Sequence, residues 1–168
     1  MTEEFLQYIW KYALYEHSSL KTRSGEEVVV INPGEYNSDS GPDFLNSKLR
    51  IGETTWAGDV EIHINSSDWD RHNHQSNKAF NSVILQVVYK DDKESRLQDG
   101  SLVPTLELKF DMNLYEHYQE LINSNKWIPC KDEIKYIDPF IFYYWLDSLA
   151  IERLHDKSEV ILHTLRLT

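Results

Sequence analysis

The chain has 168 residues, of which 40% are hydrophobic and 27% are charged. This length suits one domain with its own core and excludes two large domains. The formal net charge of −11 excludes a general basic field that would attract nucleic acid, so such a partner would need a local patch or a bound metal. The single cysteine, Cys130, excludes an intramolecular disulfide and a multi-cysteine zinc site.

The N-terminal segment, MTEEFLQYIW, has neither a basic region nor a long apolar run, so it does not resemble a secretory signal. No stretch reaches the roughly 18 consecutive apolar residues typical of a membrane span. We therefore expect a cytoplasmic protein with no membrane partner.

The first predicted element is a helix over residues 2–19. Thr2 is a suitable N-cap, and Glu3 and Glu4 then fall in the first turn, where the helix dipole favours anions. The apolar residues recur at helical spacing and form one buried stripe: Phe5, Leu6, Ile9, Trp10, Ala13 and Leu14. A short buried strand over 27–31 follows, and residues 32–42 predict a loop, because they are rich in Gly, Pro, Asn and Ser.

Residues 44–51 and 54–64 predict an antiparallel hairpin. Within the second strand, apolar residues alternate strictly with other residues. A strand has a period of two, so one face carries Asp59, Glu61 and His63. One strand therefore presents three potential metal ligands.

The length of the hairpin turn at Gly52-Glu53 decides whether Asp43 lies on the same face of the sheet as Glu61. With a two-residue turn, Asp43 pairs with Ile62 and points away from Glu61. A three-residue turn or a β-bulge would instead place both carboxylates on one face, and bulges are common beside active sites. A further alternative is that Asp43 lies just before the regular strand.

The sheet continues beyond this hairpin. Residues 66–81 predict a short helix or turn that carries His72 and His74. Residues 83–89 are nearly all apolar, which is typical of a strand buried on both faces, and a half-buried strand over 105–110 completes a sheet of about five strands. Aromatic side chains supply much of the area of a core, so we also expect burial of Trp56, Trp69, Trp127 and Trp145.

The rest of the chain predicts a helical extension. One helix follows Asp111 and ends before Pro129-Cys130, and a long amphipathic helix begins at Asp138-Pro139. We therefore expect an α/β core over 1–110 and a helical extension over 111–168. The last helix has no stop signal, as in a truncated chain or a natural C-terminal helix, and its apolar side suits a protein partner or a homo-oligomer.

The order of these elements, with Pro42-Asp43 heading one strand and Glu61-Ile62-His63 in the next, resembles the PD-(D/E)xK nuclease superfamily. The resemblance covers about residues 1–110 and implies a restriction-endonuclease-like α/β fold, with a mixed sheet of about five strands flanked by helices. The runs GPDF, WAGDVEIH, SSDW, H-x-H and VILQVVY are also similar to an uncharacterised bacterial domain-of-unknown-function family.

The superfamily resemblance implies a Mg²⁺-dependent endonuclease that hydrolyses nucleic-acid phosphodiesters. Asp43 and Glu61 would bind Mg²⁺ or Mn²⁺, because these ions prefer carboxylate oxygens. The carbonyl of Ile62 would be a third ligand, and Glu4 on the first helix would be an outer one. His63 stands where the superfamily has lysine, and it would orient or deprotonate the attacking water.

Second-tier site candidates are Asp59, Asp68, His72 and His74. Surface positions are the simpler reading of the two histidines. A zinc site built on His63, His72 and His74 is a third hypothesis, and it needs a loop at 72–74, because residues i and i+2 point apart on a helix.

The competing hypothesis is a catalytically inactive nuclease-like module that binds nucleic acid or protein. The acidic net charge and the replacement of lysine by His63 favour it. The alternating strand also suits a solvated outer face of an antiparallel sheet. DNA and RNA are equally consistent with the sequence, and the candidates for phosphate contacts are Lys48, Arg50, Arg71 and Lys78.

Overall fold

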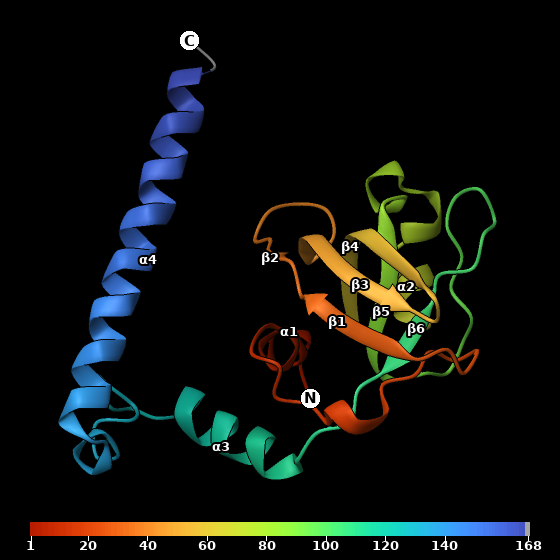
Figure 1. The fold of residues 1–168 in the computed structure, drawn as a ribbon. Coiled ribbons are helices and arrows are strands. Elements are labelled where there is room, and N and C mark those ends of the chain that lie inside the picture. The colour runs from red at the N-terminus through yellow and green to blue at the C-terminus, as the bar shows by residue number, and fades with distance from the viewer. Residues whose placement is uncertain (167–168) are drawn as a thin grey trace. The chain divides into compact units, whose positions relative to one another are not determined.

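The computed structural model describes residues 1–166 of the chain (Figure 1). The chain divides into two compact units, Met1–Tyr118 and Gln119–Thr168. This division falls later than the boundary expected after residue 110, because Leu114, Tyr115 and Tyr118 still pack against the core of the first unit.

The first helix, α1 (Glu3–Lys11), begins where the sequence predicts. The hydroxyl of Thr2 accepts a hydrogen bond from an N–H of the first turn, as an N-cap does. The helix ends in a Schellman motif, in which Ala13 adopts a left-handed φ of 53° and the N–H groups of residues 13 and 14 bond back to the last turn. The prediction of a helix over 2–19 is therefore wrong beyond Lys11, and only a short 3₁₀ turn, η1 (His17–Ser19), follows.

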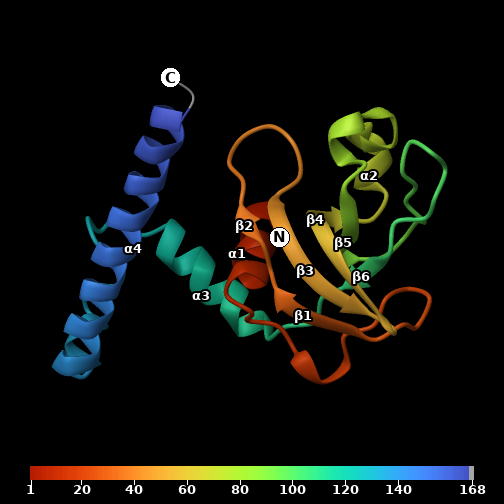
Figure 2. The same ribbon diagram turned by 45° about the horizontal axis from the view of Figure 1, so that its top comes forward.

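A mixed sheet of six strands forms the centre of the first unit (Figure 2). The strands are β1 (Val28–Asn32), β2 (Glu35–Tyr36), β3 (Phe44–Ile51), β4 (Thr54–Asn65), β5 (Val83–Lys90) and β6 (Thr105–Glu107). Their order is β1-β3-β4-β5-β6, and β2 also pairs with β3. β3 is antiparallel to β1, β2 and β4, whereas β5 is parallel to β4 and β6. The predicted hairpin is thus confirmed, and the fold is mixed α/β.

Helical segments cover both faces of this sheet (Figure 1, Figure 2). On one face, α1 packs on the main core, whose largest members include Phe5, Leu6, Ile9, Trp10, Phe44, Leu49, Ile62 and Leu85. The other face carries α2 (Asp68–Arg71) and two 3₁₀ turns, η2 (His74–Ser76) and η3 (Lys78–Phe80), over a smaller core of Trp69, Phe80, Val83 and Val103. Because β4 side chains alternate between faces, Ile62 points to α1, whereas Glu61 and His63 point to the α2 side.

The helical elements after the sheet are α3 (Met112–Ile122), η4 (Ile134–Tyr136) and α4 (Pro139–Arg166). A carboxylate oxygen of Asp138 accepts the N–H of Phe140 at 2.8 Å, which confirms the predicted start of α4. No helix among the described residues is long and apolar enough to cross a membrane.

Only one of the four tryptophans expected in the core is buried. Trp69 is fully buried, but Trp127 is 98% exposed, and Trp56 and Trp145 are also exposed. Trp56 lies in the first part of β4, where residues 54–57 are all exposed, so its size alone was a poor guide to burial.

Candidate metal centre

A β-bulge in β3 brings the two predicted metal carboxylates to one face of the sheet. The hairpin keeps the register of a two-residue turn as far as Ser47, and then residues 45 and 46 of β3 face the single residue 59 of β4. Inside the bulge, Asn46 takes a left-handed φ of 57°, which asparagine tolerates better than most residues. Beyond it, Phe44 lies opposite Val60, and Asp43 lies just before the regular strand, where its N–H bonds to Glu61.

Asp59 stabilises this bulge through both of its carboxylate oxygens. Oδ1 accepts a hydrogen bond from the Asn46 N–H at 3.1 Å, and Oδ2 accepts one from the Ser82 hydroxyl at 2.6 Å. A bulge leaves a backbone group without its ladder partner, and Asp59 satisfies that group. The register between β4 and β5 also shifts here, because residue 84 of β5 is inserted between the partners of Asp59 and Val60.

We expect Asp59→Ala to lower the free energy of unfolding by about 1–3 kcal/mol, because it removes two hydrogen bonds that each contribute about 0.5–1.5 kcal/mol. The same change should weaken Mn²⁺ binding, since the bulge sets the position of Asp43. Urea denaturation and calorimetry measure the two effects. Glu53→Ala, in the exposed hairpin turn, is the matched control, and equal stability of the two variants would contradict this role of Asp59.

Backbone hydrogen bonds fix Asp43 and Glu61 relative to each other. The Asp43 N–H donates to Glu61 Oε2 at 3.1 Å, and the Ile62 N–H donates to Asp43 Oδ2 at 2.9 Å. Gln7 on α1 donates its side-chain amide to Asp43 Oδ1 at 2.8 Å. Ile62 thus contributes its N–H to the arrangement, while coordination by its carbonyl stays a prediction.

Ionisation of this carboxylate pair is unfavourable in the absence of a cation. Burial raises the pKa of Glu61 to about 8 and the pKa of Asp43 to about 7, and the charge of Glu61 adds to the shift at Asp43. The charge of Glu3 raises the pKa of both groups further. A divalent cation would reverse these shifts, because it stabilises the ionised forms.

The α1 carboxylate that acts on this pair is Glu3. Burial raises the pKa of Glu3 itself, and the neighbouring charge of His72 opposes that shift. Glu4, the predicted outer ligand, is exposed and lines a surface pocket together with Tyr8 and Lys11. Sequence reasoning placed both glutamates in the first turn and missed which of them faces the site.

Three histidines converge beside Glu61. His63 comes from β4, His72 from the end of α2 and His74 from η2, and one ring nitrogen of each lies within 4.8 Å of the others. Glu61 Oε1 lies 3.2 Å from His74 Nε2 and 3.5 Å from His63 Nε2. Glu61 therefore presents one oxygen to Asp43 and the other to the histidines.

The two buried histidines are neutral at physiological pH. Burial lowers the pKa of His63 to about 3, and the charges of His74 and His72 add to that shift. Burial also lowers the pKa of His74, although the charges of Asp43 and Glu3 act in the opposite direction. Neutral imidazole is the form that binds metals.

Gln86 on β5 holds the far side of the His63 ring, and sequence reasoning missed it as a site residue. Its Nε2 lies 3.0 Å from His63 Nδ1 and donates to the Ser66 carbonyl at 3.1 Å. Its Oε1 accepts the Ser95 hydroxyl at 2.6 Å. A glutamine within the apolar run VILQVVY was a signal in the sequence, because an amide in a buried strand needs polar partners.

Asp68 has a structural role in the segment that carries the histidines. Its Oδ2 accepts the Asn65 N–H at 3.1 Å, and its Oδ1 pairs with Arg71 Nη2 at 2.7 Å. Both oxygens are therefore engaged, which makes Asp68 a weaker ligand candidate than Glu61.

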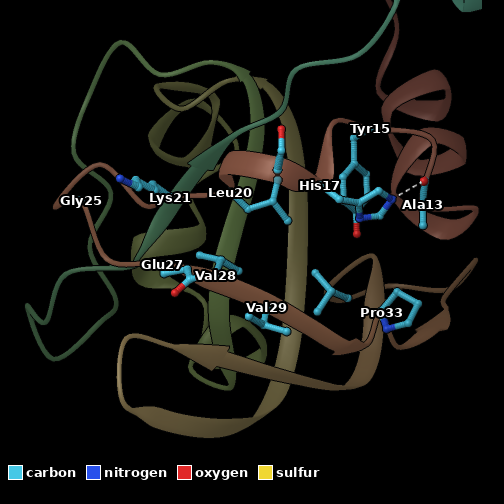
Figure 3. Close-up of a pocket in the computed structure, with 12 residues that line it drawn as sticks. Ala13, Tyr15, His17, Leu20, Lys21, Gly25, Glu27, Val28, Val29 and Pro33 are labelled. Atoms are coloured by element: carbon cyan, nitrogen blue, oxygen red, sulfur yellow. Dashed lines mark hydrogen bonds between the residues drawn. The ribbon is translucent and has the colours of Figure 1, made fainter.

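A separate surface pocket lies between the end of α1 and strand β1 (Figure 3). It is lined by residues that include Tyr15, His17, Leu20 and Val28, and His17 Nε2 lies 3.0 Å from the Ala13 carbonyl oxygen. None of the carboxylates or histidines described above lines it. The pocket is therefore distinct from the candidate metal centre.

The donor set of the centre fits a divalent cation. Its carboxylates carry raised pKa values, and His63 Nε2 and both ring nitrogens of His74 have no hydrogen-bond partner among the described residues. Buried polar atoms without partners are uncommon, and an ion that the site is built to hold is one explanation for them.

Comparison with known proteins gives a family but no activity. Residues 3–168 match the model of a family described as "Protein of unknown function (DUF2851)". No curated protein and no solved structure matches the chain.

Proposed function

Because the chain belongs to the DUF2851 family, whose description assigns no activity, we propose a function from the site: metal-dependent hydrolysis of nucleic-acid phosphodiesters on a restriction-endonuclease-like core. The observation that carries the proposal is the buried pair of Asp43 and Glu61. A bulge brings the two carboxylates together, and in the part of the chain that the structure describes no lysine or arginine forms an ion pair with either of them.

The fold supports this proposal. An antiparallel hairpin carries Asp43 before its first strand and Glu61 in its second, and a helical crossover then leads to the parallel strand β5. This is the arrangement that the resemblance to the PD-(D/E)xK superfamily implies for its two metal carboxylates. The sheet is mixed and has helical segments on both faces, as that fold requires.

Each residue of the site has a distinct proposed task. Asp43 and Glu61 would hold Mg²⁺ or Mn²⁺, and Gln7 keeps the Asp43 carboxylate in place by its hydrogen bond. A bound divalent cation supplies a more acidic water and neutralises charge that develops on the phosphate. His63, neutral and directed toward Glu61 Oε1, is positioned to orient a nucleophilic water or the substrate.

Cleavage assays on supercoiled DNA, single-stranded DNA and structured RNA test the proposal. With Mg²⁺ or Mn²⁺, we expect cleavage of at least one substrate and a loss of about 100-fold or more in Asp43→Asn, since a metal contributes several kcal/mol to the transition state. Asp39→Asn, in the exposed loop before β3, is the matched control. Equal cleavage by Asp43→Asn and the wild type would refute the proposed site.

A catalytically inactive module that binds nucleic acid or protein is the second candidate function. One observation favours it: the buried, neutral His63 does not carry the positive charge of the lysine that the superfamily has there. The proposed phosphate contacts Lys48, Arg50, Arg71 and Lys78 are all exposed, and Arg71 also pairs with Asp68. Metal binding and nucleic-acid binding without cleavage would select this second function.

A further inference from the structure

We propose that His63, His72 and His74 bind one divalent transition-metal ion of the zinc class, next to the carboxylate pair. The three imidazoles offer one nitrogen each within 4.8 Å of one another, so a single ion can reach all three. Zinc prefers nitrogen ligands in a tetrahedral arrangement, whereas Mg²⁺ prefers oxygen. The inference requires neither Asp43 nor cleavage, and with this ion bound His63 acts as a ligand instead of orienting the attacking water.

The local backbone provides the loop that such a site needs. His72 is the C-cap of α2, and Asn73 follows with a left-handed φ of 61° before η2 begins at His74. Residues 72 and 74 would point apart on a continuous helix, but the left-handed residue between them turns both rings toward His63. Their ring centroids lie 5.1 Å and 5.2 Å from that of His63.

The burial of these rings points to a ligand. His63 is 1% exposed and His74 is 9% exposed. Among the described residues neither His63 Nε2 nor either nitrogen of His74 makes a hydrogen bond, and the two Nε2 atoms have only the contacts with Glu61 Oε1 at 3.5 Å and 3.2 Å. A buried polar atom left without a partner costs about 1–3 kcal/mol. A metal ion would use one such nitrogen of each ring, and His72, which is exposed, leaves a route for the ion to enter.

Glu61 Oε1 is the natural fourth ligand. It lies 3.2 Å from His74 Nε2 and 3.5 Å from His63 Nε2, while Oε2 of the same carboxylate accepts the Asp43 N–H. The two oxygens of Glu61 thus face two different sets of donors. An ion on the histidines and an ion on Asp43 would share Glu61 as a bridging ligand, as in two-metal sites.

The surroundings of Gln86 accommodate the metal-bound form of His63. Coordination by Nε2 places the ring proton on Nδ1, so Gln86 must turn its amide oxygen toward that nitrogen. Its Nε2 would then face the hydroxyl oxygens of Ser95 and Thr105, which lie 2.6 Å and 3.5 Å from the present Oε1 and can accept. The Ser95 hydroxyl, 3.2 Å from the Ser66 carbonyl, can replace the donor that this carbonyl loses.

Titration with Co²⁺, a spectroscopic substitute for Zn²⁺, tests this site. We expect the wild type to bind Co²⁺ with visible absorption bands typical of tetrahedral nitrogen coordination. His72→Gln and His74→Gln should each lower the affinity at least about tenfold. His72 is exposed, so its replacement should leave the fold intact, and His117→Gln, an exposed histidine on α3, is the matched control.

Two outcomes would overturn the inference: no visible bands in the wild type, or unchanged affinity in His72→Gln. Asp43→Asn separates this inference from the proposed function. We expect that variant to keep the Co²⁺ bands, and their loss would place the ion on the carboxylate pair instead. Failure of the proposed hydrolysis would appear only in the cleavage assay, where Asp43→Asn would match the wild type.

Discussion

Glu61→Gln is expected to stabilise the metal-free protein, by an amount that grows with pH to a few kcal/mol at about pH 8. Burial raises the pKa of Glu61 from 4.5 to about 8, so between these values the folded protein holds a proton that the unfolded chain releases. Stability of the wild type therefore falls as pH rises through this window, at up to about 1.4 kcal/mol per pH unit. Glutamine has no proton to lose and avoids this cost.

The measurement is urea denaturation with a chelator at several values between about pH 5 and pH 8. His63 and His74 have lowered pKa values, so their contributions are lost as pH falls below about 6.5, which is the opposite trend. Both proteins contain His63 and His74, so the difference in stability between Glu61→Gln and the wild type excludes the contribution of these histidines. Glu53→Gln is the control, and a difference between Glu61→Gln and the wild type that stays constant with pH would contradict the raised pKa.

Mn²⁺ should raise the thermal midpoint of the wild type by roughly 5–10 °C at a hundredfold excess over its dissociation constant. That excess corresponds to about 2.7 kcal/mol of stabilisation, and for a chain of this size 1 kcal/mol shifts the thermal midpoint by about 2–4 °C. At a fixed Mn²⁺ concentration the shift should be larger near pH 8 than near pH 6, because binding requires Asp43 and Glu61 to release their protons and is therefore weaker at pH 6. Calorimetric scans of the wild type and Asp43→Asn measure it.

Asp43→Asn should show little of this stabilisation at either pH, since it loses one ionised ligand. A shift of the same size in both proteins would mean that Mn²⁺ acts elsewhere on this acidic chain. Asp39→Asn should behave as the wild type, because Asp39 lies in the exposed loop before β3.

The positions of most strands along the chain followed from the sequence, because the hydrophobic period and the turn residues agree there, although the short strand β2 falls in the predicted loop over 32–42. The hairpin around Gly52-Glu53, the apolar strand β5 and the start of α4 after Asp138 were all predicted at nearly their observed positions. These features depend on local spacing and capping, which a single sequence shows directly.

The site was harder to predict, because its geometry depends on one irregular residue. A period of two places Asp43 away from Glu61, and only the bulge at Asn46 brings them together. Asparagine tolerates a left-handed φ, but nothing in the sequence pattern distinguishes Asn46 from Asn32 and Asn37, which precede it. The role of Asp59 in holding that bulge was equally hidden, since its residue type also suits a metal ligand.

The choice between Glu3 and Glu4 illustrates a second limit. Both lie in the first turn of α1, and their directions differ by about 100° around the helix axis. Only the packing of α1 on the sheet shows that Glu3 acts on Asp43 and Glu61. Similarly, the convergence of His72 and His74 on His63 depends on the left-handed turn at Asn73, which residue spacing does not reveal.

Calorimetric titration with Mn²⁺ of the wild type and Glu61→Gln tests the central claim most directly, because Glu61 faces both Asp43 and the histidines. We predict stoichiometric binding to the wild type near pH 8, a loss of about 100-fold or more in Glu61→Gln, and binding by Glu53→Gln that equals the wild type. Absence of binding to the wild type, or equal binding by Glu61→Gln, would contradict a metal centre at this site.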